Sequence, residues 1–260
     1  MDVSRFARGL GRPHPNLENL VLFGSIDSTN SFGRRLVALF EGGRHRPPST
    51  LITALHQSEG RGRHGRRWSS PPGLGVCATL VLPVADRQQL PVLPLLVAVA
   101  LCRGLNGIVG DRCRLKWPND LTVGGRKIGG ILIEILGGGE GGTTVLIGFG
   151  VNHGQRRQDL PGERATSLRV ECQLLPPLAR ATAWLAAAVL DELDHLGDPR
   201  RAVERYQALS VHRAGDWLRC RTGERVVEGT FVGFDSRGFL RLASPEGELL
   251  LAAGEVDLAG

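Results

Sequence analysis

A nine-residue segment from Gly60 to Trp68 holds four arginines and three glycines. Glycine allows the backbone to pass close to a ligand, and planar guanidinium groups match the oxygens of phosphates and carboxylates. The segment therefore predicts a loop that grips an anion. Its spacing matches neither a P-loop nor a dinucleotide-binding glycine motif, so those nucleotide folds are disfavoured. RNA-binding segments and solvated turns have the same composition and stay open as alternatives.

Two lysines and a carboxylate follow further along the chain. Lys116 precedes Trp-Pro-Asn-Asp, and Lys127 follows a Gly-Gly pair, each beside an expected strand. The Pro-Asn-Asp triplet is ordinary turn chemistry, but a turn does not explain a lysine on either side. A carboxylate that attacks the α-phosphorus of ATP brings two anions together, and fixed cations lower that barrier. Five side chains could supply the charge: Arg61, Arg63, Arg66, Lys116 and Lys127.

The composition is that of an ordinary globular protein that can bury a core. Of the 260 residues, 42% are hydrophobic and 22% are charged, and the net charge is +6. The basic excess comes almost wholly from arginine, and the 5% of aromatic residues, with one tyrosine, offer few platforms for stacking bases. We therefore expect no nucleic-acid partner, although a basic RNA- or DNA-binding protein is an alternative interpretation.

The cysteines and the apolar segments indicate in which cellular compartment the protein is expected. The five cysteines are scattered and form no Cys-x-x-Cys pair, which indicates neither a disulfide framework nor a zinc cluster. Residues 1–16 show no apolar core of a secretory signal. The longest apolar stretch, 90–102, contains two prolines and is shorter than the roughly twenty residues of a membrane span. We expect a cytoplasmic protein without membrane association.

Hydrophobic periodicity predicts the elements that must position these residues. Ser28 or Thr29 should cap a helix that stops at Gly42-Gly43. The apolar face of that helix is predicted to hold Phe32, Leu36, Leu39 and Phe40. Strands are expected at 50–55, 74–82, 114–117, 121–123, 127–136 and 143–150, with a buried helix at 94–105. Gly124-Gly125 marks a hairpin, and the glycine-rich stretch 137–142 marks a further turn.

The C-terminal part has a different texture. Two helices are predicted at 176–196 and 198–209, the first with Trp184 on its apolar face. Residues 215–258 show short alternating runs separated by glycines, which is typical of a small SH3-like β-barrel. The four runs predicted as strands are 217–221, 225–234, 239–243 and 249–252. The predicted domains are 1–212 and 213–260. The fold class is α+β, with a mixed, largely antiparallel sheet packed with helices and a C-terminal SH3-like barrel.

In its motifs the chain resembles the biotin protein ligase family, which joins biotin to a lysine of carboxylase carrier domains. The resemblance rests on four segments: 25–30 (Ser-Ile-Asp-Ser-Thr-Asn), 57–68, 116–121 (Lys-Trp-Pro-Asn-Asp-Leu) and 127–134 (Lys-Ile-Gly-Gly-Ile-Leu-Ile-Glu). A weaker fifth match joins 148–152 with 165–168. The predicted C-terminal barrel also agrees with the family.

The resemblance implies a role for each matching position. Biotin binding falls to Ser28, Thr29, Asn30, Gln57, Gly60, Arg61, Gly62, Arg63, Lys127, Gly129 and Gly130. ATP binding falls to Arg61, Arg63, Arg66, Trp68, Lys116, Asn119, Lys127 and Asn152, with Trp68 either stacking on adenine or packing in the core. Catalysis falls to Arg63, Lys116 and Lys127, and Asp120 is the expected Mg²⁺ ligand.

The implied reaction activates biotin with ATP to biotinyl-5′-AMP and then biotinylates a lysine of a biotin carboxyl carrier protein. ATP, biotin and Mg²⁺ are the expected ligands. The sequence leaves the oligomeric state open, with a homodimer as one alternative. The 24 residues before Ser25 are too few for the helix-turn-helix domain of many relatives, so no repressor role is expected. A lipoate or octanoate ligase, or an acyltransferase of the same fold, is the alternative. Because ordering 60–68 costs entropy, this loop is expected to close only over bound ligands.

Overall fold

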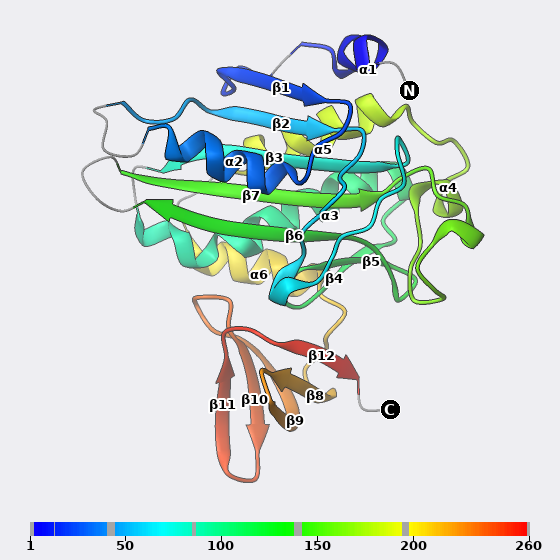
Figure 1. Cartoon of the computed structure of the whole chain (residues 1–260). Coiled ribbons are helices and arrows are strands. Elements are labelled where there is room, and N and C mark those ends of the chain that lie inside the picture. The colour runs from blue at the N-terminus through cyan, green and yellow to red at the C-terminus, as the bar shows by residue number, and fades with distance from the viewer. Residues whose placement is uncertain are drawn as a thin grey trace.

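The computed structural model describes residues 3–12, 14–40, 45–84, 87–137, 142–193 and 198–258. Two expected turns, at Gly42-Gly43 and over most of 137–142, lie outside the described residues. The described chain forms a seven-stranded sheet with helices on both faces, and a five-stranded sheet near the C-terminus (Figure 1). The α+β class predicted from the sequence is confirmed.

The large sheet runs in the order β1-β2-β3-β7-β6-β5-β4. Its strands are β1 (Asn19–Phe23), β2 (Thr50–Ala54), β3 (Gly75–Val84), β4 (Cys113–Lys116), β5 (Asp120–Val123), β6 (Arg126–Gly137) and β7 (Thr143–Asn152). β1 and β2 are parallel, and the other neighbouring pairs are antiparallel. Because β7 lies between β3 and β6, residues from distant parts of the chain meet over it.

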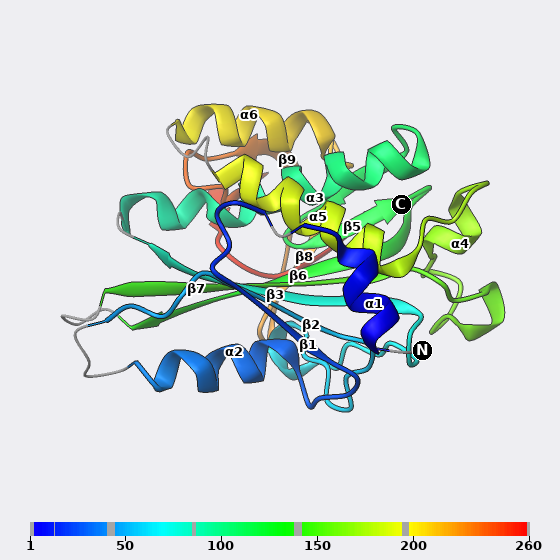
Figure 2. The same cartoon turned by 90° about the horizontal axis from the view of Figure 1, so that it is seen from above.

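Helices cover the two faces of this sheet unequally (Figure 2). α2 (Thr29–Ala38) lies on one face, and α3 (Leu93–Val109), α5 (Leu178–Leu193) and α6 (Pro199–Leu209) lie on the other. α1 (Val3–Leu10) packs against α5, and the short α4 (Leu168–Glu171) contacts α3. The apolar stretch Leu90–Val109 is long enough to cross a membrane, but 72% of its most apolar part is buried. Core packing accounts for its apolarity.

The hairpin between β5 and β6 carries Lys127 near its turn. Gly124 and Gly125 have φ values of 55° and 74°, in the left-handed region that favours glycine in tight hairpins. The register of β5 against β6 shifts between Leu121 and Thr122, so β6 holds one extra residue next to Lys127. Such a bulge re-aims a side chain and weakens the local pairing. The position of Lys127 therefore depends on what holds the other edge of β6.

The C-terminal sheet has the order β11-β10-β9-β8-β12 and is antiparallel throughout. Its strands are β8 (Trp217–Thr222), β9 (Arg225–Phe234), β10 (Leu240–Ser244), β11 (Gly247–Leu251) and β12 (Glu255–Leu258). Four of them were predicted, and β12 is an addition that pairs with β8. Trp117 ties this sheet to the larger one, because its indole Nε1 donates to the Gly238 carbonyl at 3.3 Å. The division into domains at 212/213 stays a prediction.

Two predicted helix faces are wrong in part. Leu39 is 80% exposed and Trp184 is 55% exposed, although both were expected to be buried. In α2 the buried residues are Thr29, Asn30, Gly33 and Val37. Three of these are polar or small, so hydrophobicity alone missed the most buried positions, although Phe32 and Leu36 of the predicted face do pack against the core. α1 and the edge strand β1 were not predicted, because each is short and buries few side chains.

Candidate active site

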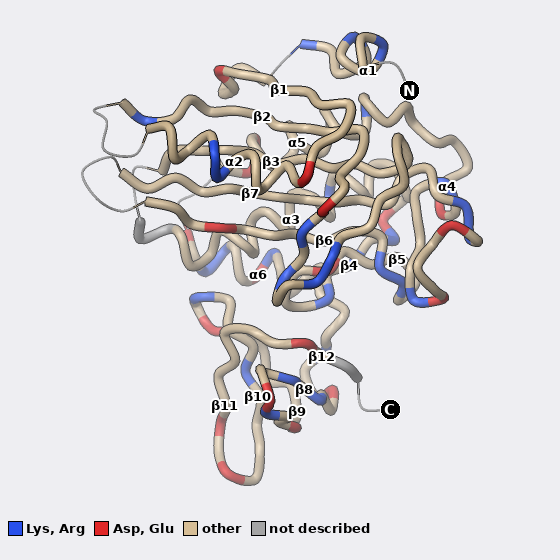
Figure 3. Tube along the Cα trace, in the orientation of Figure 1, with Lys and Arg blue, Asp and Glu red and all other residues tan. Residues whose placement is uncertain are grey.

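A cavity of about 600 Å³ opens between the large sheet, the arginine segment 60–68 and the C-terminal sheet. The predicted site residues that line it are Ser28, Thr29, Asn30, Gln57, Arg61, Gly62, Arg63, Arg66, Trp68, Lys116, Asn119, Asp120, Lys127 and Gly130. Both lysines of the chain are among them. Figure 3 shows the basic residues of the arginine segment in front of the large sheet. The cavity thus unites the four main motifs.

Neutral polar side chains close one end of the cavity, which we call the deep end: Ser28, Thr29, Asn30 and Gln57, with Thr79 behind them. The backbone N–H and the hydroxyl of Thr29 both donate to Gln57 Oε1, at 2.8 and 3.1 Å. The Thr79 hydroxyl lies 2.8 Å from Thr29 Oγ1 and 2.6 Å from Asn30 Oδ1. Since these groups already have fixed partners, the deep end presents a preformed set of donors and acceptors.

Asn30 is fixed on both sides of its amide. Its Nδ2 donates to Glu134 Oε2 at 3.0 Å and to the Leu132 carbonyl at 3.3 Å. Its Oδ1 occupies the space that a Cβ at Gly148 of β7 would need. Only glycine at this position leaves room for the Asn30 side chain.

Glu134 joins the deep end to the arginine segment. Besides Asn30, its carboxylate accepts from Arg34, and Arg61 Nη2 lies 3.2 Å from its Oε1. Burial alone raises the pKa of Glu134, but hydrogen bonds from Arg34 and Asn30, with the charge of Arg61, bring this pKa below its ordinary value. The ionised carboxylate therefore holds Arg61 against β6.

The arginine segment forms a narrow loop between β2 and β3. Gly62 N–H donates to the Arg66 carbonyl at 2.8 Å, and Trp68 N–H donates to the Gly60 carbonyl at 2.9 Å. His64 at the tip has a left-handed φ of 53°, which is uncommon for a residue with a side chain. The two arms of this loop are thus held together by backbone hydrogen bonds.

The guanidinium groups of the loop face different parts of the site. Arg63 Nη1 lies 3.4 Å from Asn119 Oδ1, and burial lowers the pKa of Arg63 while the charge of Asp120 opposes that shift. Arg66 pairs with Glu255 of β12. The C-terminal sheet therefore contributes a carboxylate to the rim of the cavity.

Trp68 anchors the end of the loop on β7. A Cβ at Gly150 would lie 2.5 Å from its Cε2 and 2.6 Å from its Nε1, so the indole rests on the bare backbone of that glycine. The Nε1 of Trp68 is buried and has no hydrogen-bond partner. This contact favours packing over adenine stacking as the role of Trp68 in the structure described, and stacking stays a prediction.

Lys127 and Asp120 form an ion pair in the cavity. Their Nζ and Oδ1 atoms are 2.5 Å apart. Asn119 is fixed beside them, because its Nδ2 donates to the Ile131 carbonyl at 2.9 Å and its carbonyl accepts from Ile131 N–H at 3.1 Å. Lys116 lies opposite Asp120 in the β4–β5 pairing. The two lysines therefore flank one carboxylate.

The predicted magnesium ligand Asp120 lacks a cage of further ligands. Among the described residues, no group of three or more His, Cys, Asp or Glu side chains could hold a metal ion. Asp120 is thus not part of such a group, and its carboxylate is already paired with Lys127.

Three predicted site residues do not line the cavity: Gly60, Gly129 and Asn152. The two glycines permit close backbone approach, since a Cβ at Gly60 would overlap the Trp68 carbonyl and one at Gly129 would lie 2.8 Å from the Gly150 carbonyl. Asn152 is buried, and its Nδ2 donates to the Thr166 carbonyl at 2.9 Å. These three residues shape the walls of the site from behind.

Sequence reasoning missed several residues that build the cavity or its rim. It gave no role to Thr79 or Glu134, which hold the Asn30 side chain, and it did not foresee the rim formed by 161–165 and 254–256. Glu134 stands inside a recognised motif, so an acidic residue within the apolar run 131–136 was a usable signal. The rim segments carry no such signal, because only the folded chain brings them to the cavity.

Comparison with known proteins gives concordant matches. Residues 22–152 match the biotin/lipoate A/B protein ligase family, and residues 219–259 match the biotin protein ligase C terminal domain. The biotin–[acetyl-CoA-carboxylase] ligase of Paracoccus denitrificans is 32% identical, with 90% of this chain and 98% of that protein covered. The bifunctional ligase/repressor BirA of Bacillus subtilis is also 32% identical, over 82% of this chain and 67% of its own length.

Solved structures share the fold. The biotin protein ligase of Aquifex aeolicus, in complex with biotin and ATP, superposes with a TM-score of 0.75 at 24% identity. The match covers 93% of this chain and 98% of that one. The ligase of Leishmania major in complex with biotin gives a TM-score of 0.58 at 26% identity, with 92% of this chain covered and 99% of that one.

Proposed function

Since the chain belongs to the biotin protein ligases of the biotin/lipoate A/B protein ligase family, we propose that its cavity activates biotin with ATP and passes it to a protein lysine. Biotin ligation is the activity that family membership assigns, and the residue roles are inferred. First, a carboxylate oxygen of biotin attacks the α-phosphorus of ATP and pyrophosphate leaves. The ε-amine of the acceptor lysine then attacks the carbonyl carbon of biotinyl-5′-AMP, loses a proton, and AMP leaves.

One observation carries these assignments: Arg63 and Lys127 line a single cavity although Arg63 comes from the loop between β2 and β3 and Lys127 from the start of β6. Two anions must approach each other in the first step. At 4 Å one opposite-charge pair is worth on the order of 4 kcal/mol at an effective dielectric of about 20. Together with Lys116, these cations would stabilise the charge that builds on the phosphoryl oxygens. No covalent enzyme intermediate is required, so positioning and charge would do the catalysis.

The deep end would hold the ureido ring of biotin. That ring offers N–H donors and a carbonyl acceptor, which the hydroxyl of Ser28, the hydroxyl of Thr29 and the amide of Gln57 can match. The valeryl carboxylate would then point towards Lys127, Arg61 and Arg63. For this to happen, Lys127 must exchange Asp120 for the ligand, and Arg61 must exchange Glu134.

Magnesium would enter with ATP. Mg²⁺ usually keeps several waters and takes one or two carboxylates together with phosphate oxygens. Asp120 offers one carboxylate at the cavity, which fits this pattern. When bound, the ion would neutralise phosphate charge, and Asp120 would orient it.

The acceptor is proposed to be a biotin carboxyl carrier protein or domain. Its lysine would reach the anhydride past the rim formed by 161–165 and 254–256. A cytoplasmic location and a homodimer stay predictions.

Two alternatives predicted from the sequence are disfavoured. Lipoate or octanoate ligation, or acyl transfer on the same fold, fits the first family match, but the match of 219–259 to a biotin protein ligase domain favours biotin. For a nucleic-acid-binding role, the relative from Paracoccus denitrificans, 98% of which is covered, is named as a ligase alone and gives no support. The relative from Bacillus subtilis is named a ligase/repressor, and 67% of its length is covered.

Pyrophosphate release in the presence of ATP and biotin, lipoate or octanoate tests the proposal. We expect release with biotin, and a loss of about a hundredfold or more in Lys127→Ala, since a fixed charge beside the reacting atoms is removed. Arg200→Ala, at an exposed position of α6, is the control and should match the unmodified protein. Release with lipoate but not with biotin would refute the substrate assignment, and unchanged release in Lys127→Ala would refute the role of that lysine.

A further inference from the structure

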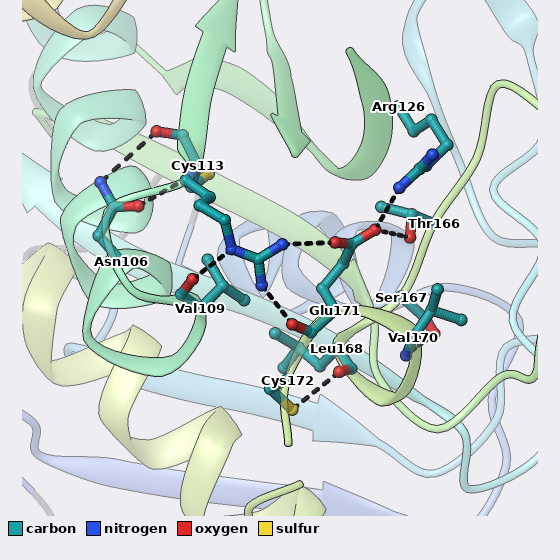
Figure 4. Close-up of polar contacts among 11 residues, drawn as sticks. Asn106, Val109, Cys113, Arg126, Thr166, Ser167, Leu168, Val170, Glu171 and Cys172 are labelled. Atoms are coloured by element: carbon teal, nitrogen blue, oxygen red, sulfur yellow. Dashed lines mark hydrogen bonds and ion pairs between the residues drawn. The ribbon is translucent and has the colours of Figure 1, made fainter. Parts of the chain in front are cut away.

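Behind the cavity, Glu171 of α4 is a buried carboxylate that the proposed reaction does not use (Figure 4). Its side chain is 5% exposed. Its Oε1 accepts from the Thr166 hydroxyl at 2.5 Å and from Arg126 Nη2 at 2.9 Å, and its Oε2 accepts from Arg112 Nη1 at 2.9 Å. Burial alone raises the pKa of Glu171, but these three donors bring it below its ordinary value. Glu171 is therefore an ionised anchor with three charge-assisted hydrogen bonds.

Two of these donors border Lys127. Arg126 precedes Lys127 in β6, and Thr166 lies across from it. Thr166 N–H donates to the Lys127 carbonyl at 2.9 Å, while Lys127 N–H donates to the Arg164 carbonyl at 2.8 Å. Glu171 thus closes a ring that runs through Arg126, the Lys127 backbone and Thr166.

This ring supports β6 next to Lys127, where the pairing of β6 with β5 is interrupted. On the β5 side, the extra residue next to Lys127 interrupts the regular pairing. On the opposite side, Arg112 extends the ring to the core, because its Nε donates to the Val109 carbonyl at the end of α3 at 2.9 Å. Glu171 therefore links the Lys127 backbone to a helix packed in the hydrophobic core. The cavity rim 161–165 belongs to the same supported segment.

We propose that Glu171 is a positioning residue for the ligase reaction: through Arg126 and Thr166 it fixes the backbone from which the Lys127 ammonium reaches the cavity. Glu171 itself touches no substrate. The inference rests on the proposed role of Lys127. A displacement of about 1 Å can cost on the order of a hundredfold in rate, so this support should act on kcat.

Hydrogen exchange in the ligand-free protein tests the support without catalysis. Glu171→Gln removes the charge, and Thr166→Val removes only one hydroxyl donor. We expect the Lys127 and Thr166 amides to exchange about tenfold faster in both variants, because their local opening becomes easier. Glu192→Gln breaks another buried ion pair, with Arg205 of α6, and should leave both amides unchanged. Unchanged exchange in Glu171→Gln and Thr166→Val would overturn the proposal.

A double-mutant cycle on biotin-dependent pyrophosphate release tests the link to Lys127. Glu171→Gln should lower kcat about tenfold in the unmodified chain but less than about twofold in Lys127→Ala, because coupled residues are not additive. Equal losses in both backgrounds would overturn positioning through Lys127. If the unmodified protein released no pyrophosphate with biotin, the proposed function would fail instead, and hydrogen exchange would still decide whether Glu171 supports Lys127.

Discussion

The deep end and the arginine loop of the cavity are built in opposite ways. In the deep end, Ser28, Thr29 and Asn30 are only 2%, 3% and 4% exposed, and neutral groups bond to one another. In the loop, Arg61 and Arg66 are exposed and each is paired with a carboxylate. A neutral, satisfied pocket can receive a polar ring with little rearrangement, whereas paired cations must first exchange partners. In the proposed function, recognition of biotin thus falls to the neutral deep end, and activation of biotin falls to cations that must first leave their carboxylate partners.

Two glycines of β7 allow each region to be disturbed separately. Gly148 makes room for Asn30, and Gly150 makes room for Trp68. They are two residues apart on one strand, so their side-chain directions are equivalent. Alanine at each position therefore tests one end of the cavity while leaving the other in place.

The largest effect is expected for Gly148→Ala. Its new methyl group would displace Asn30 and leave the partners of this buried amide unsatisfied, at a cost of about 3 kcal/mol in the free energy of unfolding. Biotin affinity should fall about a hundredfold, as polar groups of the pocket lose their arrangement. Chemical denaturation and calorimetric titration measure the two quantities.

Asn30→Ala supplies the control for this prediction. In that background, Gly148→Ala should cost less than about 1 kcal/mol, because the side chain it would displace is gone. An undiminished cost would show that Gly148 acts through something other than Asn30.

A smaller effect is expected where the two regions meet, at Glu134. Because the folded state lowers the pKa of this carboxyl below 4.5, its contribution to stability is present above pH 4.5 and is lost as the pH falls through the folded pKa. At pH 7, Glu134→Gln should be about 2 kcal/mol less stable than the unmodified chain, since hydrogen bonds to a charged group are lost.

Urea denaturation from pH 7 down to pH 3 follows this difference. The gap between the two proteins should narrow below pH 4.5. Asp27→Asn, which breaks an exposed ion pair with Arg35, is a comparison at a less buried site. A gap that persisted at the lowest pH would contradict the role of the Glu134 charge.

The smallest effect on stability is expected for Gly150→Ala. The methyl group would push Trp68 off β7, and since this tryptophan belongs to a surface loop, the cost should be about 1 kcal/mol. The loop should open more readily, so trypsin should cut after its arginines several times faster. Biotin and ATP together should slow cleavage in the unmodified chain. Equal cleavage rates in both proteins would mean that Trp68 does not anchor the loop.

Much of the fold followed from local sequence. Gly124-Gly125 fixed a hairpin, and Asp198 with Pro199 marked the start of α6, because caps and tight turns depend on a few neighbouring residues. β1 depends instead on parallel pairing with β2, some thirty residues away, so its own sequence carried little signal. The face of α2 was wrong in part, at Leu39, because polar and small residues occupy the most buried positions of this helix, while Phe32 and Leu36 pack against the core as predicted.

The candidate site likewise contains residues that the sequence identified and residues that it did not. Arginine, lysine and the Ser-Thr-Asn triplet were identifiable because their side chains carry the chemistry themselves. Thr79 and Glu255 were not, because a threonine inside a strand and a glutamate near the C-terminus carry no signal until folding brings Thr79 to Asn30 and Glu255 to the cavity rim. Asn152 was placed at the nucleotide, yet its amide holds the Thr166 carbonyl behind the wall.

The placement of Lys116 and Lys127 has a practical consequence. They are the only side-chain amines in this chain, and both line the cavity. An acylating reagent that modifies lysines would therefore mark the reaction chamber alone, apart from the N-terminal amine, and bound ligands should shield it. The outer surface carries its positive charge on guanidinium groups, so an anhydride escaping the enzyme would find no lysine there to modify.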